Sequence, residues 1–303
     1  MTNRQLFEFS PEVEAALAAR KPVVALESTV IAHGLPRPHN FETALRLEEI
    51  VRKTGAVPAT IAILAGRLCV GLNENQLRRI AETDDIKKVS TRDLPIALAR
   101  RWDGATTVAG TIWIAHRADI HILATGGIGG VHRGSLPDVS ADLPELTRTP
   151  IVVVCSGAKI VLDLPATREW LETHGVTVVG YQCDELPGFY SRRSGLSVDA
   201  VVNSGTEVAE LVKAQRALAT ESALLVAVPV PVAAEVPSEL LNRVLSDAVK
   251  EAEKSRIAGR ELTPFLLSRM AGQSGGATLH ANIALLENNV HVGAEVALAL
   301  SSK

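Results

Sequence analysis

The sequence predicts an α/β fold, a three-layer α/β/α sandwich around a mostly parallel sheet. Short, wholly apolar runs of four or five residues alternate along the chain with longer amphipathic stretches. Strands that are apolar on both faces are typical of parallel sheets covered by helices on both sides. The 303 residues are 47% hydrophobic but only 3% aromatic, so we expect a large core of aliphatic side chains.

The elements follow from the apolar periodicity in chain order. Strands are predicted at 22–26, 60–64, 68–70, 120–124, 151–155, 176–179 and 224–228. Helices are predicted at 40–54, 74–82, 94–102, 107–117, 166–174, 206–220, 237–256 and 277–300. Gly55 and Gly175 are typical of helix ends. The sequence has no fixed-period repeat and no Pro/Ser-rich linker, so we interpret 1–303 as a single domain.

Composition excludes several classes of protein. The net charge is −3 and no basic stripe is visible, which argues against nucleic acid as a partner. The three cysteines have no CxxC spacing and predict neither a disulfide framework nor a zinc site. The longest apolar run, 223–236, contains Pro229, Pro231 and Glu235 and is too short and broken to span a membrane. The N-terminus lacks the apolar segment of a signal peptide, so we expect a soluble, reduced, cytoplasmic protein.

Four loops are the candidates for chemistry. Ligands of open α/β sheets bind beyond the carboxyl ends of the strands. In this sequence the loops that follow predicted strands and carry polar residues are 27–34, 125–142, 156–159 and 229–232.

Lys159 lies four residues after an apolar strand, with Ile160, Val161 and Leu162 behind it. Apolar surroundings remove water from an amine and favour its neutral form, which can attack a sugar aldehyde carbon and form a Schiff base. The alternative is a lysine whose stem is buried and whose charge reaches water.

Glu27 follows the first predicted strand directly. A partly buried carboxyl group there can act as a general acid or base. The alternative is a structural acceptor for nearby backbone N–H groups.

The loop 125–142 reads TGGIGGVHRGSLPDVSAD. Its glycines expose backbone N–H groups, as phosphate-binding loops do. His132 stands where a dinucleotide fingerprint needs its third glycine, and no GK[ST] follows. The sequence therefore supports neither a nicotinamide cofactor nor ATP.

Two carboxylates of this loop, Asp138 and Asp142, are oxygen ligands that suit Mg²⁺ or Mn²⁺. Alternatively, Asp142 is a helix N-cap and Asp138 a turn residue. The segment 87–95, KKVSTRDLP, suits phosphate or sugar binding, or is a capped helix start with solvated lysines. Asn282 lies in a predicted helix, where its amide can pair with a nucleobase edge or bond to backbone.

Taken together, these segments resemble the pseudouridine-5′-phosphate glycosidase family, also described as indigoidine synthase A-like. The matching stretches span nearly the whole chain and read ESTVIAHGLPRP, KVSTRDLP, TTVAGT, ATGGIGGVHRG, VSADLPEL, VVVCSGAKIVLDLPAT, LPGFYSRRSG and NIALLENNV. The resemblance leaves the roles of the residues in GFYSRRSG open.

The resemblance implies an α/β/α sandwich assembled as a homotrimer, with a divalent metal, commonly Mn²⁺. It implies Glu27 as proton donor, Lys159 as nucleophile and Asp138 as metal ligand. It further implies that the substrate is contacted by Lys88, Val108, Ser140, Ala141, Asp142, His132 (near the phosphate or the metal) and Asn282 (facing uracil).

The expected reaction is reversible cleavage of the C-glycosidic bond of pseudouridine 5′-phosphate, giving uracil and ribose 5-phosphate, in pseudouridine catabolism. The bond has no leaving oxygen or nitrogen to protonate, so the paired-carboxylate route of ordinary glycosidases suits it poorly. A lysine Schiff base offers another route. The alternatives are another Schiff-base lyase acting on a sugar phosphate, or a non-enzymatic binder of a phosphosugar or nucleotide.

Overall fold

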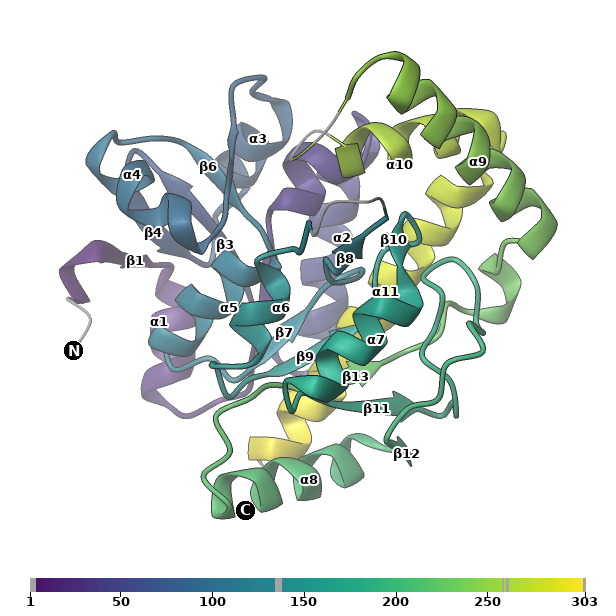
Figure 1. Cartoon of the computed structure of the whole chain (residues 1–303). Helices are drawn as coiled ribbons and strands as arrows, with labels where there is room; N and C mark the ends of the chain where they lie inside the picture. The colour runs from purple at the N-terminus through teal and green to yellow at the C-terminus, as the bar shows by residue number, and fades with distance from the viewer. Residues whose placement is uncertain (1–3, 134–137, 258, 260–261, 302–303) are drawn as a thin grey trace.

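The predicted α/β class is confirmed by the computed structural model, which describes residues 4–133, 138–257, 259 and 262–301. An eleven-stranded, mostly parallel sheet lies between helices (Figure 1). Its strands are β1 (Phe7–Phe9), β2 (Val23–Glu27), β3 (Val57–Leu64), β4 (Arg67–Val70), β5 (Lys87–Val89), β6 (Gly104–Thr106), β7 (Ile122–Ala124), β9 (Val152–Cys155), β11 (Thr177–Tyr181), β12 (Ala200–Val202) and β13 (Leu224–Ala227). A separate two-stranded sheet pairs β8 (Val131–His132) with β10 (Leu162–Asp163).

The main sheet runs in the order β1-β4-β3-β2-β7-β9-β13-β11-β12, and β6 extends it from β3 with β5 alongside. Among the described residues of this sheet, the β3–β4 and β3–β6 pairs are antiparallel and the other pairs are parallel. The central strands β2, β7, β9 and β13 are buried along their whole length, as their apolar sequences predict, and β2 ends in the one charged residue among them, Glu27.

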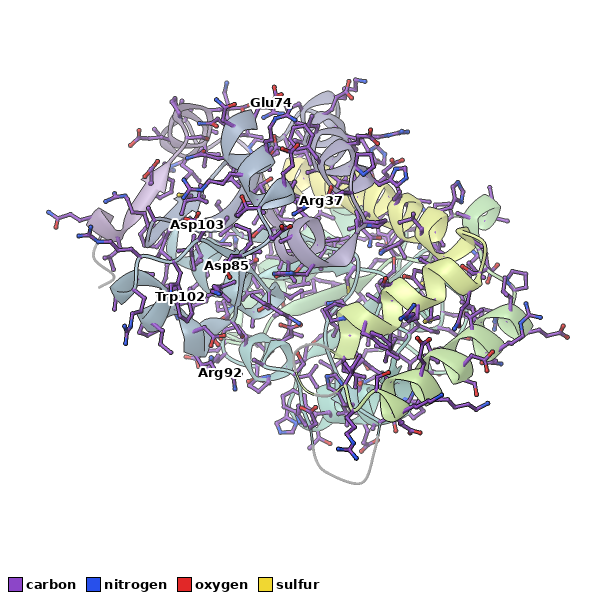
Figure 2. The ribbon with its side chains drawn as sticks, turned by 90° about the horizontal axis from the view of Figure 1, so that it is seen from above. Arg37, Glu74, Asp85, Arg92, Trp102 and Asp103 are labelled. Carbon is purple, nitrogen blue, oxygen red and sulfur yellow. The ribbon has the colours of Figure 1, made fainter. Side chains whose placement is uncertain are left out.

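Helices cover both faces of the sheet (Figure 1). They are α1 (Pro11–Ala18), α2 (His39–Thr54), α3 (Glu74–Glu82), α4 (Leu94–Ala99), α5 (Val108–Arg117), α6 (Asp142–Leu146), α7 (Leu164–Thr173), α8 (Gly205–Ala217), α9 (Ser238–Lys254), α10 (Leu262–Gln273) and α11 (Ala277–Ser301). One face carries α5, α6 and α7, and the other carries α2, α8 and α11. Seen from above, α9 and α10 lie side by side at the end of the molecule opposite Trp102 and Asp103 (Figure 2).

Helix α11 is the central helix of its face. It contacts β2, β7 and β9 and packs against α2 and α8. A Cβ at Gly293 would lie 3.0 Å from the Cβ of Ala124, so the glycine lets the helix approach the sheet closely. By length and composition alone, α11 is also apolar enough to cross a membrane, and this packing accounts for its apolar face.

Several strands and helices of the structure are not predicted from the sequence, and two predicted helices end earlier than expected. Strands β5 and β6 carry lysines or small residues in place of an apolar run, and they form because they pair with each other and with β3. Strands β1 and β12 and helices α1 and α10 were also not predicted. The predicted helices 94–102 and 206–220 end at Ala99 and Ala217, and Arg101 and Ala219 beyond them are left-handed, with φ of 51° and 54°.

The fold brings three strand ends to one edge of the sheet. Glu27 ends β2, Thr125 follows β7 and Ser156 follows β9. The loops after β7 and β9 bond to each other, because the Ser156 N–H donates to the Gly126 carbonyl at 2.9 Å. The Lys159 N–H likewise donates to the Ile128 carbonyl at 3.1 Å. These contacts hold the catalytic candidates at the carboxyl end of a parallel sheet, where ligands of such folds bind.

Candidate active site

A cavity of about 450 Å³ opens at this edge of the sheet. Most of the residues that the sequence singles out line it. They are Glu27, Lys88, His132, Asp138, Ser140, Ala141, Asp142 and Lys159. They come from separate parts of the chain, so the fold brings them together.

Glu27 is the buried acid of this cavity, with 6% of its surface exposed. Its Oε1 accepts a hydrogen bond of 2.7 Å from the Thr125 hydroxyl. Burial raises the pKa of Glu27 above its ordinary value, while the positive charge of Lys159 and the Thr125 hydrogen bond oppose that rise. A carboxyl group with a raised pKa keeps its proton to higher pH, as a proton donor must.

Lys159 shares the cavity with Glu27. Gly157, with φ of 79°, turns the chain after β9, and a Cβ there would lie 2.4 Å from the Pro187 carbonyl oxygen. The Lys159 side chain is half-buried and lines both the main cavity and a smaller one that Glu27 also lines. Its charge acts on the Glu27 carboxyl. The amine and the acid therefore lie close together, in one pocket.

Asp142 fixes the glycine loop to α5. Its Oδ2 accepts from the Gly129 N–H at 2.7 Å, and its Oδ1 accepts from the Ala109 N–H at 2.8 Å. A Cβ on Gly129 would lie 2.1 Å from the Ser140 hydroxyl, so only glycine fits there. Asp142 is the first residue of α6 and not its N-cap, and both of its oxygens serve neighbouring backbone.

One end of the cavity is rich in donors. Lys88 of β5, Ser90 and Arg92 line it, and so does Thr107, which caps the N-terminus of α5 by accepting from the Gly110 N–H. Arg92 lies at the rim of the molecule, with most of its side chain exposed (Figure 2). Cations and hydroxyls at a helix N-terminus suit a phosphate.

The other end is apolar and narrow. A cavity of about 40 Å³ shares Glu27, Lys88 and Lys159 with the larger one and adds Phe189 and Asn282. Asn282 lies on α11 and is 5% exposed, and its amide has no hydrogen-bond partner within the described ranges. An amide in an apolar slot can pair with a flat polar ring.

Phe189 belongs to the segment GFYSRRSG, whose residues had no assigned role in the sequence analysis. The structure gives this residue a structural role. It has φ of 66°, in the left-handed region, and its ring is buried. A Cβ on Gly127 would lie 2.7 Å from that ring, so the glycine loop and the ring pack directly together. Phe189 thus forms an apolar wall beside Lys159.

Two predicted site residues are placed differently from the rest. The Val108 side chain is buried in the hydrophobic core and does not line the cavity, while Thr107 before it does. Asp138 lines the cavity but is exposed, and within the described residues no group of three His, Cys, Asp or Glu side chains can hold a metal ion. A single carboxylate does fit a hydrated divalent cation, which keeps several waters and few protein ligands.

The sequence analysis did not identify Asn289, a buried residue that holds two loops of the site in place. Asn289 of α11 is fully buried, and its Nδ2 donates to the Thr125 carbonyl at 2.8 Å and to the Ser156 hydroxyl at 3.1 Å. It therefore ties together the loops that follow β7 and β9. The available signal was an amide within an otherwise apolar helical face, where a polar group needs partners.

Comparisons with known proteins identify the family of this chain. The family described as indigoidine synthase A like protein matches residues 12–299. A pseudouridine-5′-phosphate glycosidase of Geobacillus kaustophilus is 50% identical over 97% of this chain and 98% of its own. One of Herpetosiphon aurantiacus is 51% identical, over 96% of this chain and 97% of its own.

Solved structures are similar over the same extent. The prealnumycin C-glycosynthase AlnA, in complex with ribulose 5-phosphate, superimposes with a TM-score of 0.90 and 40% identity, covering 98% of each chain. An indigoidine synthase A-like protein from Thermotoga maritima superimposes with a TM-score of 0.91 and 38% identity, covering 99% of this chain and 98% of its own.

Proposed function

This chain belongs to the indigoidine synthase A-like family, and on that premise we propose that its cavity cleaves the C-glycosidic bond of pseudouridine 5′-phosphate, reversibly, to uracil and ribose 5-phosphate. Relatives that match nearly its whole length carry the name of this activity. The observation that carries the proposal is the buried carboxyl of Glu27 in one pocket with the amine of Lys159.

The two groups divide the chemistry between them. Glu27 donates its proton to the ribose ring oxygen while the Lys159 amine attacks the anomeric carbon, so the C–O bond of the ring breaks and a C–N bond forms. The attacking amine gives up one proton to the Glu27 carboxylate, and the nitrogen lone pair then expels uracil, whose C5 takes that proton as the C–C bond breaks. The Schiff base that remains on Lys159 is hydrolysed by water and releases ribose 5-phosphate.

The two ends of the cavity orient the substrate. The phosphate fits the donor-rich part at Ser90, Arg92 and Thr107, and uracil fits the narrow cavity beside Phe189 and Asn282, with Lys88 lining both. The sugar then spans the middle, where Glu27 and Lys159 meet. This arrangement gives each end of a nucleoside monophosphate a surface of matching chemistry.

The proposal includes a divalent cation, Mn²⁺ by family resemblance, held by Asp138 and water. When bound, it would supply positive charge and ordered water beside the phosphate. His132 lines the same part of the cavity as Asp138, and its backbone N–H donates to the Asp138 carbonyl at 2.8 Å. We further propose a homotrimer that works in the cytoplasm.

Uracil release tests the function. The purified chain, incubated with pseudouridine 5′-phosphate, should liberate uracil and ribose 5-phosphate, and the reverse mixture should form the nucleotide. A chain that cleaves other sugar phosphates and releases no uracil would be a different Schiff-base lyase. A chain that only binds nucleotides would do so equally well after Lys159→Arg.

A further inference from the structure

The hydroxyl of Thr125 is aimed at one oxygen of the proton donor. It donates to Oε1 of Glu27 at 2.7 Å, and the side chains of both residues are buried. A hydrogen bond between buried groups is not exposed to competing water, so it fixes geometry more firmly than a surface contact does.

The direction of this bond distinguishes the two carboxyl oxygens. A protonated carboxyl group has one O–H oxygen and one carbonyl oxygen. Because Thr125 donates to Oε1, that oxygen is held as the acceptor, and the proton of Glu27 is left on Oε2. The oxygen that is not bonded to Thr125 is therefore the one available to the substrate.

Thr125 is itself held rigidly. Its backbone N–H donates to the Val154 carbonyl at 3.0 Å, and its own carbonyl accepts from Asn289 Nδ2 at 2.8 Å. Asn289 also bonds to Ser156, so the donor is fixed to the sheet, to α11 and to the loop that leads to Lys159.

Four other influences act on the same carboxyl group. Burial raises the pKa of Glu27, and the negative charge of Asp142 raises it further. Lys159 and Lys88 lower it, as does the Thr125 hydrogen bond. Thr125 is the neutral member of this set, so replacing it changes a hydrogen bond without changing the net charge of the cavity.

We propose that Thr125 is a positioning residue that reserves Oε1 of Glu27 as an acceptor and so presents the proton on Oε2 to the ring oxygen of the sugar. This inference rests on the proposed function, in which Glu27 is the proton donor. It predicts that the threonine hydroxyl governs the turnover rate, and not the strength of substrate binding.

The test is the pH profile of uracil release in Thr125→Val and Thr125→Ser. Valine keeps the shape and removes the donor, so the proton of Glu27 is held more tightly and the limb where activity falls at high pH should move to higher pH. We expect kcat to fall roughly 10- to 100-fold with KM within about twofold, because a misplaced donor weakens general acid catalysis. Serine keeps the hydroxyl and should restore both values.

Thr125→Ala removes the donor without adding a methyl group and serves as a second variant, with the same result expected. An unchanged profile and kcat in Thr125→Val and Thr125→Ala, alongside an inactive Glu27→Gln, would overturn the positioning role and leave the proposed function standing. Full uracil release by Glu27→Gln would overturn both the positioning role and Glu27 as the proton donor, whereas no uracil release by the unaltered chain would overturn the proposed function.

Discussion

At the scale of single residues, burial gives Glu27 its chemistry. The carboxyl group is the last residue of a buried strand, and desolvation raises its pKa. The sequence could place this acid after a strand but could not show its partner, because Thr125 is 98 positions away and has no distinctive local pattern. Contacts between distant strand ends depend on strand order, which periodicity does not reveal.

The raised pKa of Glu27 predicts a cost in stability. The folded protein keeps a proton that the unfolded chain has lost, so the free energy of unfolding falls as pH rises from the ordinary carboxyl value of 4.5 through the raised one. Glu27→Gln cannot titrate, and its free energy of unfolding should fall less over that range. Denaturant unfolding at a series of pH values measures this, and an identical pH dependence in both proteins would contradict it.

The same substitution should remove the proton donor. We expect Glu27→Gln to lower kcat for uracil release by roughly 10²- to 10⁴-fold, the usual worth of a general acid. A protein that is inactive but no less stable would separate the catalytic role of Glu27 from any structural one.

Asn282 should set the specificity for the base. Its amide faces the narrow end of the cavity without a partner in the described part of the chain, so Asn282→Leu should keep the fold. We expect KM for pseudouridine 5′-phosphate to rise more than tenfold, the effect of about 1.4 kcal/mol. The control is Asn288→Leu, six positions further along the same helix, where the amide bonds to the Pro229 carbonyl and does not line these cavities. Equal KM values in the two variants would contradict the assignment.

At the scale of elements, loops after parallel strands form the site. Three of the four candidate loops were predicted correctly, while the fourth, 229–232, does not line the cavity. The loops after the first strand, after 120–124 and after 151–155 all reach the cavity. The sequence did not predict β5 or α10, which line the cavity too, because their sequences lack a clear apolar period. The residues that line the cavity are therefore harder to predict from the sequence than the residues that carry its chemistry.

Asp142 links the glycine loop to α5, and Asp142→Asn should break one of its two bonds. An amide has one acceptor oxygen, so an NH₂ group would face the N–H of Gly129 or Ala109. We expect a loss of about 1–3 kcal/mol in the free energy of unfolding, together with lower kcat. Asp138→Asn, in the same loop but exposed, should leave stability unchanged. Equal free energies of unfolding of Asp142→Asn and the wild type would contradict a stabilising role for these two hydrogen bonds.

At the scale of the whole molecule, the alternation of apolar runs and amphipathic stretches correctly predicted a covered parallel sheet. The apolar periodicity of the sequence does not reveal which strands pair with one another. It therefore could not predict the order of the strands, the antiparallel β3–β4 and β3–β6 pairs or the small β8–β10 sheet. The resemblance of motifs along the whole chain to a known family supplied the expected roles of the site residues, which periodicity could not, but not the strand order.

The homotrimer is a prediction about the assembled molecule. The chain has a mass of 32.2 kDa, so light scattering coupled to size-exclusion chromatography should give three times that value. A mass that equals one chain at micromolar concentration would contradict it.

The central claim is that Lys159 forms a covalent bond to the sugar. Incubation with ribose 5-phosphate and borohydride should reduce the Schiff base to a stable adduct, and peptide mapping should locate the added mass on Lys159 alone. Lys159→Arg should carry no adduct and release no uracil. An adduct on another lysine, or none in a preparation that releases uracil, would contradict the account.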